Sequence, residues 1–185
     1  MGIIGKDFNY KIIKNFLSTD EINLLKEFCK IRHRLNIDFK DPKVETLDTG
    51  FYGDPIMESL LINKTKIVQD EVGLELLPTY SFWRMYTKFA DLKKHTDRES
   101  CEISVTAMIG SDSTPWPIFI GDKEIELKDG DAVIYLGCDV EHYRKEFQGD
   151  WHAQVFFHYV DANGKNKEWW KDKRTFWGEQ LENDF

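Results

Sequence analysis

The chain has 185 residues, of which 41% are hydrophobic and 14% aromatic, with only 12 glycines and 5 prolines; this composition excludes disordered, collagen-like and low-complexity proteins. The 33 acidic and 25 basic residues give a net charge of −8, and because a negative field repels phosphate backbones, we expect no nucleic-acid partner. A chain of this length without internal repeats or linkers predicts one domain over residues 1–185.

The three cysteines, Cys29, Cys101 and Cys138, are widely spaced and form no CxxC motif. This pattern is typical neither of a disulfide framework nor of a zinc site, and it indicates reduced thiols. No apolar run reaches the about 20 residues that span a membrane, and the first residues lack the apolar core of a signal peptide. We therefore expect a cytoplasmic protein without membrane contact, and the sequence indicates no oligomeric state.

Two helices are predicted within residues 1–75, which we interpret as a helical support after a short extended stretch over residues 10–16. Residues 18–34 begin with the capping box S-T-D-E and then carry apolar residues at helical spacing. Residues 54–72 begin with Asp-Pro, a helix cap followed by proline at the first helical position. The charged connection between them, residues 35–53, is either a plain surface loop or a lid.

From Leu76 onward the apolar period changes from 3.6 to 2, which indicates strands. They are predicted over residues 80–86, 102–109, 117–120, 123–127, 132–136 and 152–160. Helices followed by short antiparallel strands favour an α+β fold. We expect residues 76–161 to form a cupin-like jelly roll, that is a double-stranded β-helix, with the N-terminal helices packed on its major sheet. Residues 162–185 would form an aromatic C-terminal tail.

His95 and Asp97 form an H-x-D pair. On a strand, residues i and i+2 point to the same face about 6.7 Å apart, so that an imidazole and a carboxylate can bind one ion. The pair needs a third ligand, and His142 follows a predicted strand and turn, where a strand end opens onto a barrel mouth. Two histidines and one carboxylate leave positions open on a metal, as in non-haem Fe(II) oxygenases, whereas a structural zinc site closes its shell.

Several motifs in this half of the chain resemble those of a known family. Arg84-Met85-Tyr86, Leu92 and His95-Thr96-Asp97-Arg98 are similar to the R-x-Y and L-x-x-H-x-D motifs of 2-oxoglutarate/Fe(II) dioxygenases of the prolyl 4-hydroxylase-like branch. Further stretches recur in the same order in small bacterial and phage-type members: residues 98, 100–104, 116–118, 127–131, 142–144 and 154–159. The resemblance covers residues 8–161 of the chain.

The resemblance implies that His95, Asp97 and His142 are catalytic residues that hold Fe(II). It also implies that Tyr86 hydrogen-bonds the distal carboxylate of the cosubstrate 2-oxoglutarate. The implied reaction uses O2, with ascorbate as a candidate reductant, to convert 2-oxoglutarate to succinate and CO2 while a C–H bond of a small-molecule or peptide substrate is hydroxylated. A prolyl residue in a peptide, a free amino acid and other small molecules all stay open as that substrate.

One position departs from the family pattern. Members of the prolyl hydroxylase type carry Lys or Arg about ten residues after the distal histidine to pair with the cosubstrate carboxylate. Here that position falls on His152, and residues 147–163 contain no Lys or Arg. Arg144 lies two residues after His142, on the same face if the strand continues, and offers a guanidinium fork. We predict that Arg144 binds the carboxylate, with His152 or Arg84 as alternatives.

Alternation along the last predicted strand separates two faces. The cleft side would carry His152, Gln154, Phe156 and His158, and the side toward the helices would carry Ala153, Val155, Phe157 and Tyr159. His158 among aromatic neighbours is typical of a hydrogen-bonded core histidine rather than of a ligand. Trp83 and Met85 alternate with the motif residues of their strand, so we expect them in the core under the helices.

Other interpretations stand beside the oxygenase. One is a metal-free jelly roll such as a carbohydrate-binding module, and another is a cupin-like zinc or nickel protein that acts as a hydrolase, an isomerase or a binding module, since the ligands themselves do not select iron. Arg98 and Arg84 are candidates for ion pairs near the ligands, and Trp116 and Tyr143 for the substrate side. The aromatic residues 169–177 either stack on bases or pack over the domain, which the acidic charge favours.

Overall fold

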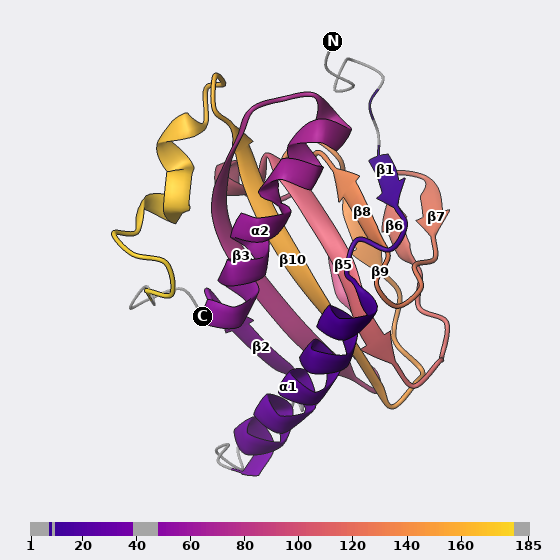
Figure 1. Ribbon diagram of the computed structural model, residues 1–185. Helices are drawn as coiled ribbons and strands as arrows, with labels where there is room; N and C mark the ends of the chain where they lie inside the picture. The colour runs from indigo at the N-terminus through magenta and orange to yellow at the C-terminus, as the bar shows by residue number, and fades with distance from the viewer. Residues whose placement is uncertain (1–7, 9, 39–47, 180–185) are drawn as a thin grey trace.

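Two antiparallel sheets face each other in the computed structural model, which describes residues 8, 10–38 and 48–179. The larger sheet consists, in spatial order, of β1 (Tyr10–Ile13), β8 (Ala132–Tyr135), β5 (Ile103–Ser111), β10 (Trp151–Asp161), β3 (Leu76–Thr87) and β2 (Thr49–Tyr52). The smaller sheet consists of β4 (Leu92–His95), β9 (His142–Arg144), β6 (Ile118–Ile120) and β7 (Lys123–Ile125). Helices α1 (Thr19–Asp38) and α2 (Pro55–Val72) cover the outer face of the larger sheet (Figure 1).

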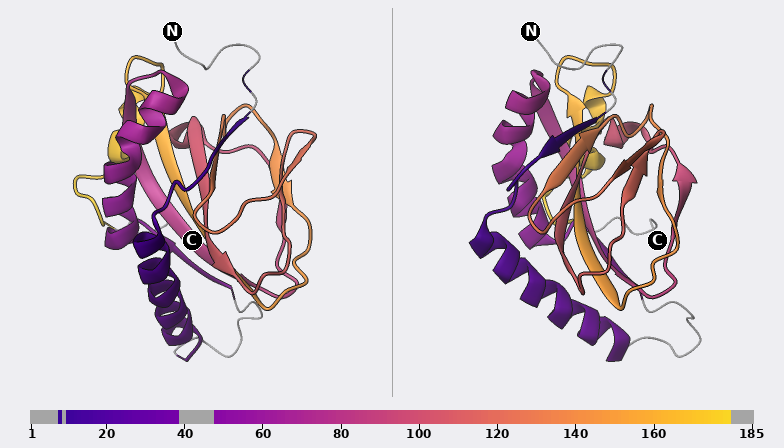
Figure 2. Two further views of the ribbon diagram at one scale, coloured as in Figure 1. Left: turned by 45° about the vertical axis from the view of Figure 1, so that its right-hand side comes forward. Right: turned by 90° about the vertical axis from the view of Figure 1, so that its right-hand side faces the viewer.

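The smaller sheet lies on the opposite side of the larger sheet from the helices (Figure 2). Strands that are distant in sequence pair across each sheet, as in a jelly roll. The predicted α+β fold, with a double-stranded β-helix and N-terminal helices on its major sheet, is therefore confirmed.

Both helices begin at the predicted caps. Ser18 and Glu21 form the reciprocal capping box, because Ser18 N donates to Glu21 Oε2 (2.7 Å) and Glu21 N donates to Ser18 Oγ (3.2 Å). Before α2, Asp54 Oδ1 accepts a hydrogen bond from Ile56 N (3.2 Å), and α2 ends at Gly73, whose φ of 71° is the left-handed conformation that glycine adopts without strain. Local side-chain chemistry thus determines both helix starts.

The hydrophobic core lies between the helices and the larger sheet. The side of β10 that was predicted to meet the helices is fully buried there: Ala153, Val155, Phe157 and Tyr159. Trp83 and Met85 of β3 lie in the same core, as predicted. Because side chains alternate along a strand, the other side of β3 and β10 points into the space between the two sheets.

The sequence patterns overlooked the short or isolated strands. β4 and β9 have few residues, mostly charged or histidine, and therefore lack a readable apolar alternation. β1 and β2 form the two edges of the larger sheet, so residues 1–75 supply strands as well as helices. The connection predicted over residues 35–53 contains the end of α1 and all of β2, while residues 39–47, where a lid was considered, lie outside the described residues.

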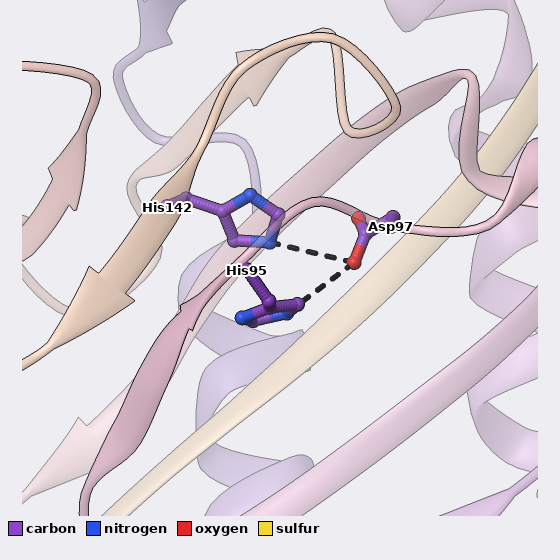
Figure 3. Close-up of side chains that lie close together, drawn as sticks. All are labelled: His95, Asp97 and His142. Carbon is purple, nitrogen blue, oxygen red and sulfur yellow. Dashed lines mark ion pairs between the residues drawn. The ribbon is translucent and has the colours of Figure 1, made fainter.

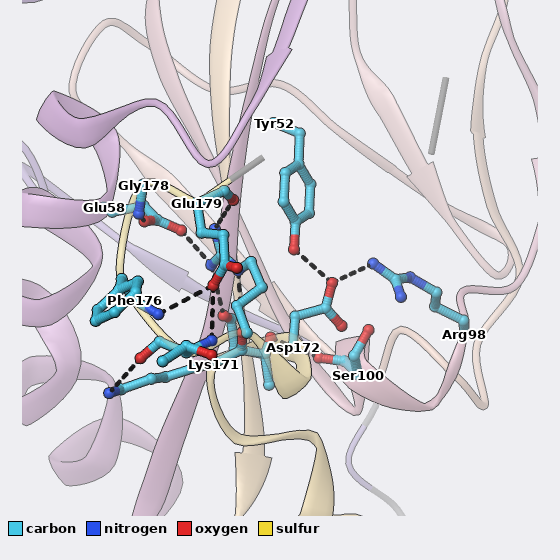
Figure 4. A network of polar contacts seen from close by, with 12 residues as sticks. Tyr52, Glu58, Arg98, Ser100, Lys171, Asp172, Phe176, Gly178 and Glu179 are labelled. Atoms are coloured by element: carbon cyan, nitrogen blue, oxygen red, sulfur yellow. Dashed lines mark hydrogen bonds and ion pairs between the residues drawn. The ribbon is translucent and has the colours of Figure 1, made fainter. Parts of the chain in front are cut away.

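The segment after β10 packs against the domain. Its 3-10 helix η2 (Lys167–Lys173) lies beside β3 and β10. Arg174 and Glu58 of α2 form an ion pair with fully buried side chains, and Arg174 also donates to Thr79 O (3.2 Å), within the network of Figure 4. This agrees with a tail that packs rather than one that stacks on bases. Within the described residues, no helix has the length and apolar character needed to cross a membrane.

Candidate active site

Three side chains converge between the two sheets. His95 ends β4, His142 begins β9, and Asp97 lies in the loop between β4 and the short 3-10 helix η1 (Glu99–Cys101). Asp97 Oδ1 lies 3.5 Å from His95 Nε2 and 3.4 Å from His142 Nε2 (Figure 3). The structure therefore brings together the three residues that the sequence suggested as metal ligands.

Pairing of the two short strands and one glycine place this triad. β4 and β9 run antiparallel with His95 opposite His142, so that the ring centroids are 4.3 Å apart. Asp97 N donates to Gly137 O (2.8 Å), which holds the loop after β4 against the turn before β9. A Cβ atom at Gly137 would lie 2.5 Å from Asp97 Oδ2. Only glycine leaves room for the carboxylate there.

The donor atoms fit one divalent metal ion. The Nδ1–H group of each histidine donates to a backbone carbonyl, His95 to Lys93 O (2.7 Å) and His142 to Val140 O (3.0 Å). This leaves Nε2 of each ring as the ligand atom, aimed at Asp97. Two atoms bound to one ion by bonds of about 2.1 Å lie at most about 4.2 Å apart, which both separations satisfy. Two imidazoles and one carboxylate occupy one side of an ion and leave other positions open.

The charges of the triad also suit a cation. Burial alone would raise the pKa of Asp97, but hydrogen bonds from His142 and His95 outweigh burial and lower that pKa far below its usual value. The same contact with Asp97 raises the pKa of His95, against the opposing effect of burial. Asp97 is therefore an anion at every physiological pH and needs to lose no proton when it binds a metal.

A second group of possible ligands shares Asp97 and consists of Asp97, Cys101 and His158. Tyr80 OH lies 3.1 Å from Cys101 Sγ, and burial, reinforced by the charge of Asp97, raises the pKa of this thiol to about 12. A thiol has to be deprotonated before it binds a metal. The pair of histidines with Asp97 is therefore the better metal site.

Ser104 and His158 hold the carboxylate from behind. Ser104 Oγ donates to Asp97 Oδ2 (3.0 Å) and lies 3.0 Å from His158 Nδ1, because Ser104 and His158 are opposite each other on β5 and β10. Oδ1 is thus left to face the two histidines. His158 is buried and hydrogen-bonded, as predicted, but it lies in the wall of the site rather than in the core under the helices. Burial lowers its pKa to about 4, so its ring is neutral.

Removing the Ser104 hydroxyl should loosen the candidate metal site. We expect Ser104→Ala to raise the dissociation constant for Fe(II) or nickel about tenfold, since residues that orient a metal ligand contribute about 10- to 100-fold in affinity. Ser81→Ala is the matched control, because Ser81 is equally buried but its hydroxyl has no hydrogen-bond partner. Metal titration of the folded proteins checks this, and equal affinity of Ser104→Ala and the wild type would contradict it.

The triad lines a cavity of about 380 Å³. Its other lining residues are largely aromatic or cationic: Tyr52, Tyr80, Phe82, Arg84, Tyr86, Leu92, Arg98, Tyr135, Phe156 and His158. A concave, mostly apolar cavity of this size with a few convergent polar groups is typical of a small-molecule site. Tyr86 therefore shares the cavity with the three candidate ligands, as the resemblance implied.

Arg144 lies beside this cavity, in a fully buried position. Its Nη2 donates to Gln154 Oε1 (2.7 Å), its Nη1 donates to Trp116 O, and its Nε has no partner. Gln154 Nε2 in turn lies 3.4 Å from Tyr86 OH, so Gln154 bridges Arg144 and Tyr86. Arg144 itself lines a second cavity of about 340 Å³ together with His152.

The three predicted basic candidates differ in their partners. Arg84 pairs with Asp48 (2.8 Å), whereas no carboxylate of the described residues lies within ion-pair distance of Arg144. Burial lowers the pKa of Arg144 to about 10, which leaves it charged at neutral pH. A buried cation without a counter-ion is costly. His152 is neutral, because burial and then the charge of Arg144 lower its pKa to about 3, and both of its ring nitrogens lack partners.

Two further expectations were wrong. Arg98 pairs with Asp172 (2.6 Å) rather than with the neighbouring carboxylate of the triad. Tyr143 stacks on Phe119 with ring centroids 4.7 Å apart and does not line the cavity of the triad. Trp116 likewise lines the second cavity, beside Arg144.

The sequence reading did not identify Ser104, Gly137 and Asp172 as parts of the site. Ser104 was visible only as one member of the strand after the H-x-D motif, and Gly137 only as a turn residue. Asp172 lies in the tail, 74 residues after its partner Arg98, so no local pattern connects the two.

Comparisons with known proteins identify the fold. No protein-family profile and no curated protein sequence matches the chain. Solved structures do match it: a 2OG-Fe(II) oxygenase family oxidoreductase from Burkholderia pseudomallei superposes with a TM-score of 0.61 and 14% identity, covering 86% of this chain and 87% of that one. The chain is thus similar in fold to a protein of the family that its motifs resemble.

Two other matches point the same way. A prolyl-4-hydroxylase from Pseudomonas putida matches with a TM-score of 0.61 and 16% identity, covering 84% of this chain and 94% of that one. HygX from Streptomyces hygroscopicus, with nickel, 2-oxoglutarate and hygromycin B bound, matches with a TM-score of 0.64 and 12% identity, covering 84% of each chain. The chain has the fold of 2-oxoglutarate/Fe(II) oxygenases, including prolyl hydroxylases.

Proposed function

We propose that this chain is a 2-oxoglutarate- and Fe(II)-dependent dioxygenase that hydroxylates a C–H bond and converts 2-oxoglutarate to succinate. The observation that carries this proposal is the triad His95, Asp97 and His142, which faces a cavity with one side of the candidate metal position left open. The fold shared with 2-oxoglutarate/Fe(II) oxygenases supports it. A structural metal site would surround its ion with protein ligands instead.

Each residue of the triad has a defined role in this proposal. His95 and His142 bind Fe(II) through Nε2, and Asp97 binds it through Oδ1, while Ser104 keeps Oδ2 turned away. When bound, the iron supplies the activation of O2 that side chains cannot provide. The protein contributes the ligand geometry and a largely apolar cavity that limits access of water.

We further propose that Arg144 and Tyr86 bind the distal carboxylate of 2-oxoglutarate. Arg144 is buried without a carboxylate partner among the described residues and has one unused donor, Nε. An anion at this position would neutralise it through charge-assisted hydrogen bonds. Arg84 is the weaker candidate because Asp48 already neutralises it, and His152 is weaker because its ring carries no charge at neutral pH.

Formation of succinate tests the function directly. With Fe(II), ascorbate, O2 and 2-oxoglutarate, we expect the purified protein to release succinate, with the rate increased by one or more members of a panel of amino acids and peptides. Protein treated with a chelator should release none, because the reaction needs the metal. No succinate release with any panel member, together with no binding of 2-oxoglutarate by the nickel-loaded protein, would sink the proposal.

No observation on the described residues favours a cupin-like hydrolase, isomerase or binding module. Divalent-metal affinity alone does not select iron, so the cosubstrate is what distinguishes the two functions. An oxygenase must bind a 2-oxo acid, and a hydrolase has no use for Arg144 and Tyr86 converging on a dianion. Competition by a 2-oxo acid mimic such as N-oxalylglycine would therefore support the oxygenase.

For the substrate, a peptidyl proline and a free amino acid are the first candidates, by analogy with the prolyl hydroxylases of the same fold. We also propose the cytoplasm as the compartment, supported by three cysteines that are unpaired in the structure. A nucleic-acid partner is disfavoured by the net charge of −8.

A further inference from the structure

The cavity of the triad has two chemically different ends along β3. Tyr80, Phe82, Arg84 and Tyr86 are alternate residues of that strand and all line the cavity. A strand rises about 3.3 Å per residue, so Tyr80 and Tyr86 are about 20 Å apart. Tyr86 lies at the end with Arg144, which we assign to the cosubstrate. The end at Tyr80 is therefore left for the primary substrate.

A cation lies at this second end. The Arg98 guanidinium lies 4.9 Å from the ring centroid of Tyr80, and the residue directly follows the candidate ligand Asp97. Its side chain is 41% exposed and contacts Asp172 through Nη2 alone (2.6 Å). A guanidinium carries five donors in a planar fork, so the edge of Arg98 that does not contact Asp172 is available to a ligand.

The C-terminal segment holds Arg98 in this position. The Asp172 side chain is fully buried, and its Oδ2 accepts hydrogen bonds from Arg98 and from Tyr52 OH (2.6 Å) (Figure 4). Lys171, Asp172 and Lys173 all have positive φ values, of 53°, 55° and 63°. Three consecutive non-glycine residues in the left-handed region are costly and persist where the surrounding structure imposes them. The backbone strain thus accompanies the contact that places Asp172 beside the cavity.

We propose that Arg98 binds a carboxylate of the primary substrate, so that this substrate is a small carboxylic acid with an apolar body. The inference rests on the proposed dioxygenase function and specifies its substrate class. The walls between Arg98 and the triad are aromatic, namely Tyr52, Tyr80, Phe82 and Phe156, and suit an apolar body. An internal residue of a peptide has no carboxylate to offer Arg98.

The charge of the cavity favours the same class. Of the described residues that line it, Asp97 is the only carboxylate, and the candidate metal would neutralise it. Arg84 and Arg98 are both cationic, in a chain whose net charge is −8. A cavity lined by cations in an acidic protein attracts anions locally, although the protein as a whole repels them.

Calorimetric titration tests this assignment on the full-length, nickel-loaded protein. 2-Oxoglutarate is titrated first, which reports on the proposed function separately. Phenylacetate and its uncharged amide, phenylacetamide, are then titrated with saturating 2-oxoglutarate and again without it. We expect phenylacetate to bind with a dissociation constant below about 10 mM and about tenfold more tightly than the amide, since a charge-assisted contact at a partly exposed site contributes about this factor.

Variants then locate the carboxylate. Arg98→Met should weaken phenylacetate binding about tenfold, to the level of the amide, and Arg98→Lys should restore part of it because Lys keeps the charge but not the fork. Lys66→Met is the matched control, because Lys66 is also a cation with its own carboxylate partner but lies on the exposed surface of α2. Thermal melts establish that each variant is folded, and binding of 2-oxoglutarate should be unchanged in all of them.

Three results would overturn the assignment: phenylacetate binding no tighter than phenylacetamide, undiminished acid binding by folded Arg98→Met, or a doubly blocked prolyl peptide binding more tightly than the acid whether or not Arg98 is present. The last result would indicate an internal peptide residue as the substrate. Loss of 2-oxoglutarate binding in the wild type would instead contradict the proposed function, and the acid titrations without 2-oxoglutarate would still decide the role of Arg98.

Discussion

Replacement of His95 or Asp97 by alanine is expected to abolish stoichiometric binding of Fe(II) and all release of succinate, while the protein stays folded. Each residue supplies one of three ligand atoms that converge between the sheets, and two remaining donors rarely retain an ion against water. The fold should survive because His95 is 37% exposed at a strand end and packs in no hydrophobic cluster. Metal analysis after gel filtration and circular dichroism measure the two expectations separately.

His33→Ala is the matched control for this prediction. His33 is also partly buried and hydrogen-bonded, to Thr49 Oγ1 (2.7 Å), but it lies on α1, outside the cavity. It should retain iron and turnover. Iron bound at one equivalent per chain in His95→Ala would remove the triad as the metal site.

Arg144→Ala is expected to raise the apparent KM for 2-oxoglutarate about 10- to 100-fold, because a charge-assisted pair in a buried position contributes about 1.5–3 kcal/mol. Iron affinity should change little, since Arg144 is not among the converging ligand atoms. Arg144→Lys should recover only part of the loss, since it keeps the charge and loses the planar fork. Steady-state kinetics and equilibrium titration with 2-oxoglutarate check these expectations.

The alternatives predict a different order of effects. His152→Ala should have a smaller effect than Arg144→Ala, because its neutral ring offers one hydrogen bond and no charge. Arg84→Ala should also have a smaller effect, because Asp48 already neutralises Arg84. If His152→Ala cripples 2-oxoglutarate binding while Arg144→Ala leaves it intact, the carboxylate lies at the position typical of prolyl hydroxylases and our assignment of Arg144 is wrong.

Some features of this protein were readable because they depend only on neighbouring residues. The capping box at Ser18 and the Asp54-Pro55 start place both helices, since a helix end is determined within one turn. Alternation along β10 separates the buried side of Val155 and Phe157 from the side that faces the cavity, since strand geometry alone determines alternation. The H-x-D pair is equally local.

The remaining features depend on which strands pair and in what register, and these are long-range properties. His142 becomes the third candidate ligand because β9 pairs with β4, and Gly137 leaves room for Asp97 only through that pairing. The uncompensated charge of Arg144 and the pairing of Arg98 with Asp172 follow from the identities of neighbours far away in the chain. Sequence alone determined the elements and the type of chemistry, and only the tertiary structure decided which charges have partners and which are left for a ligand.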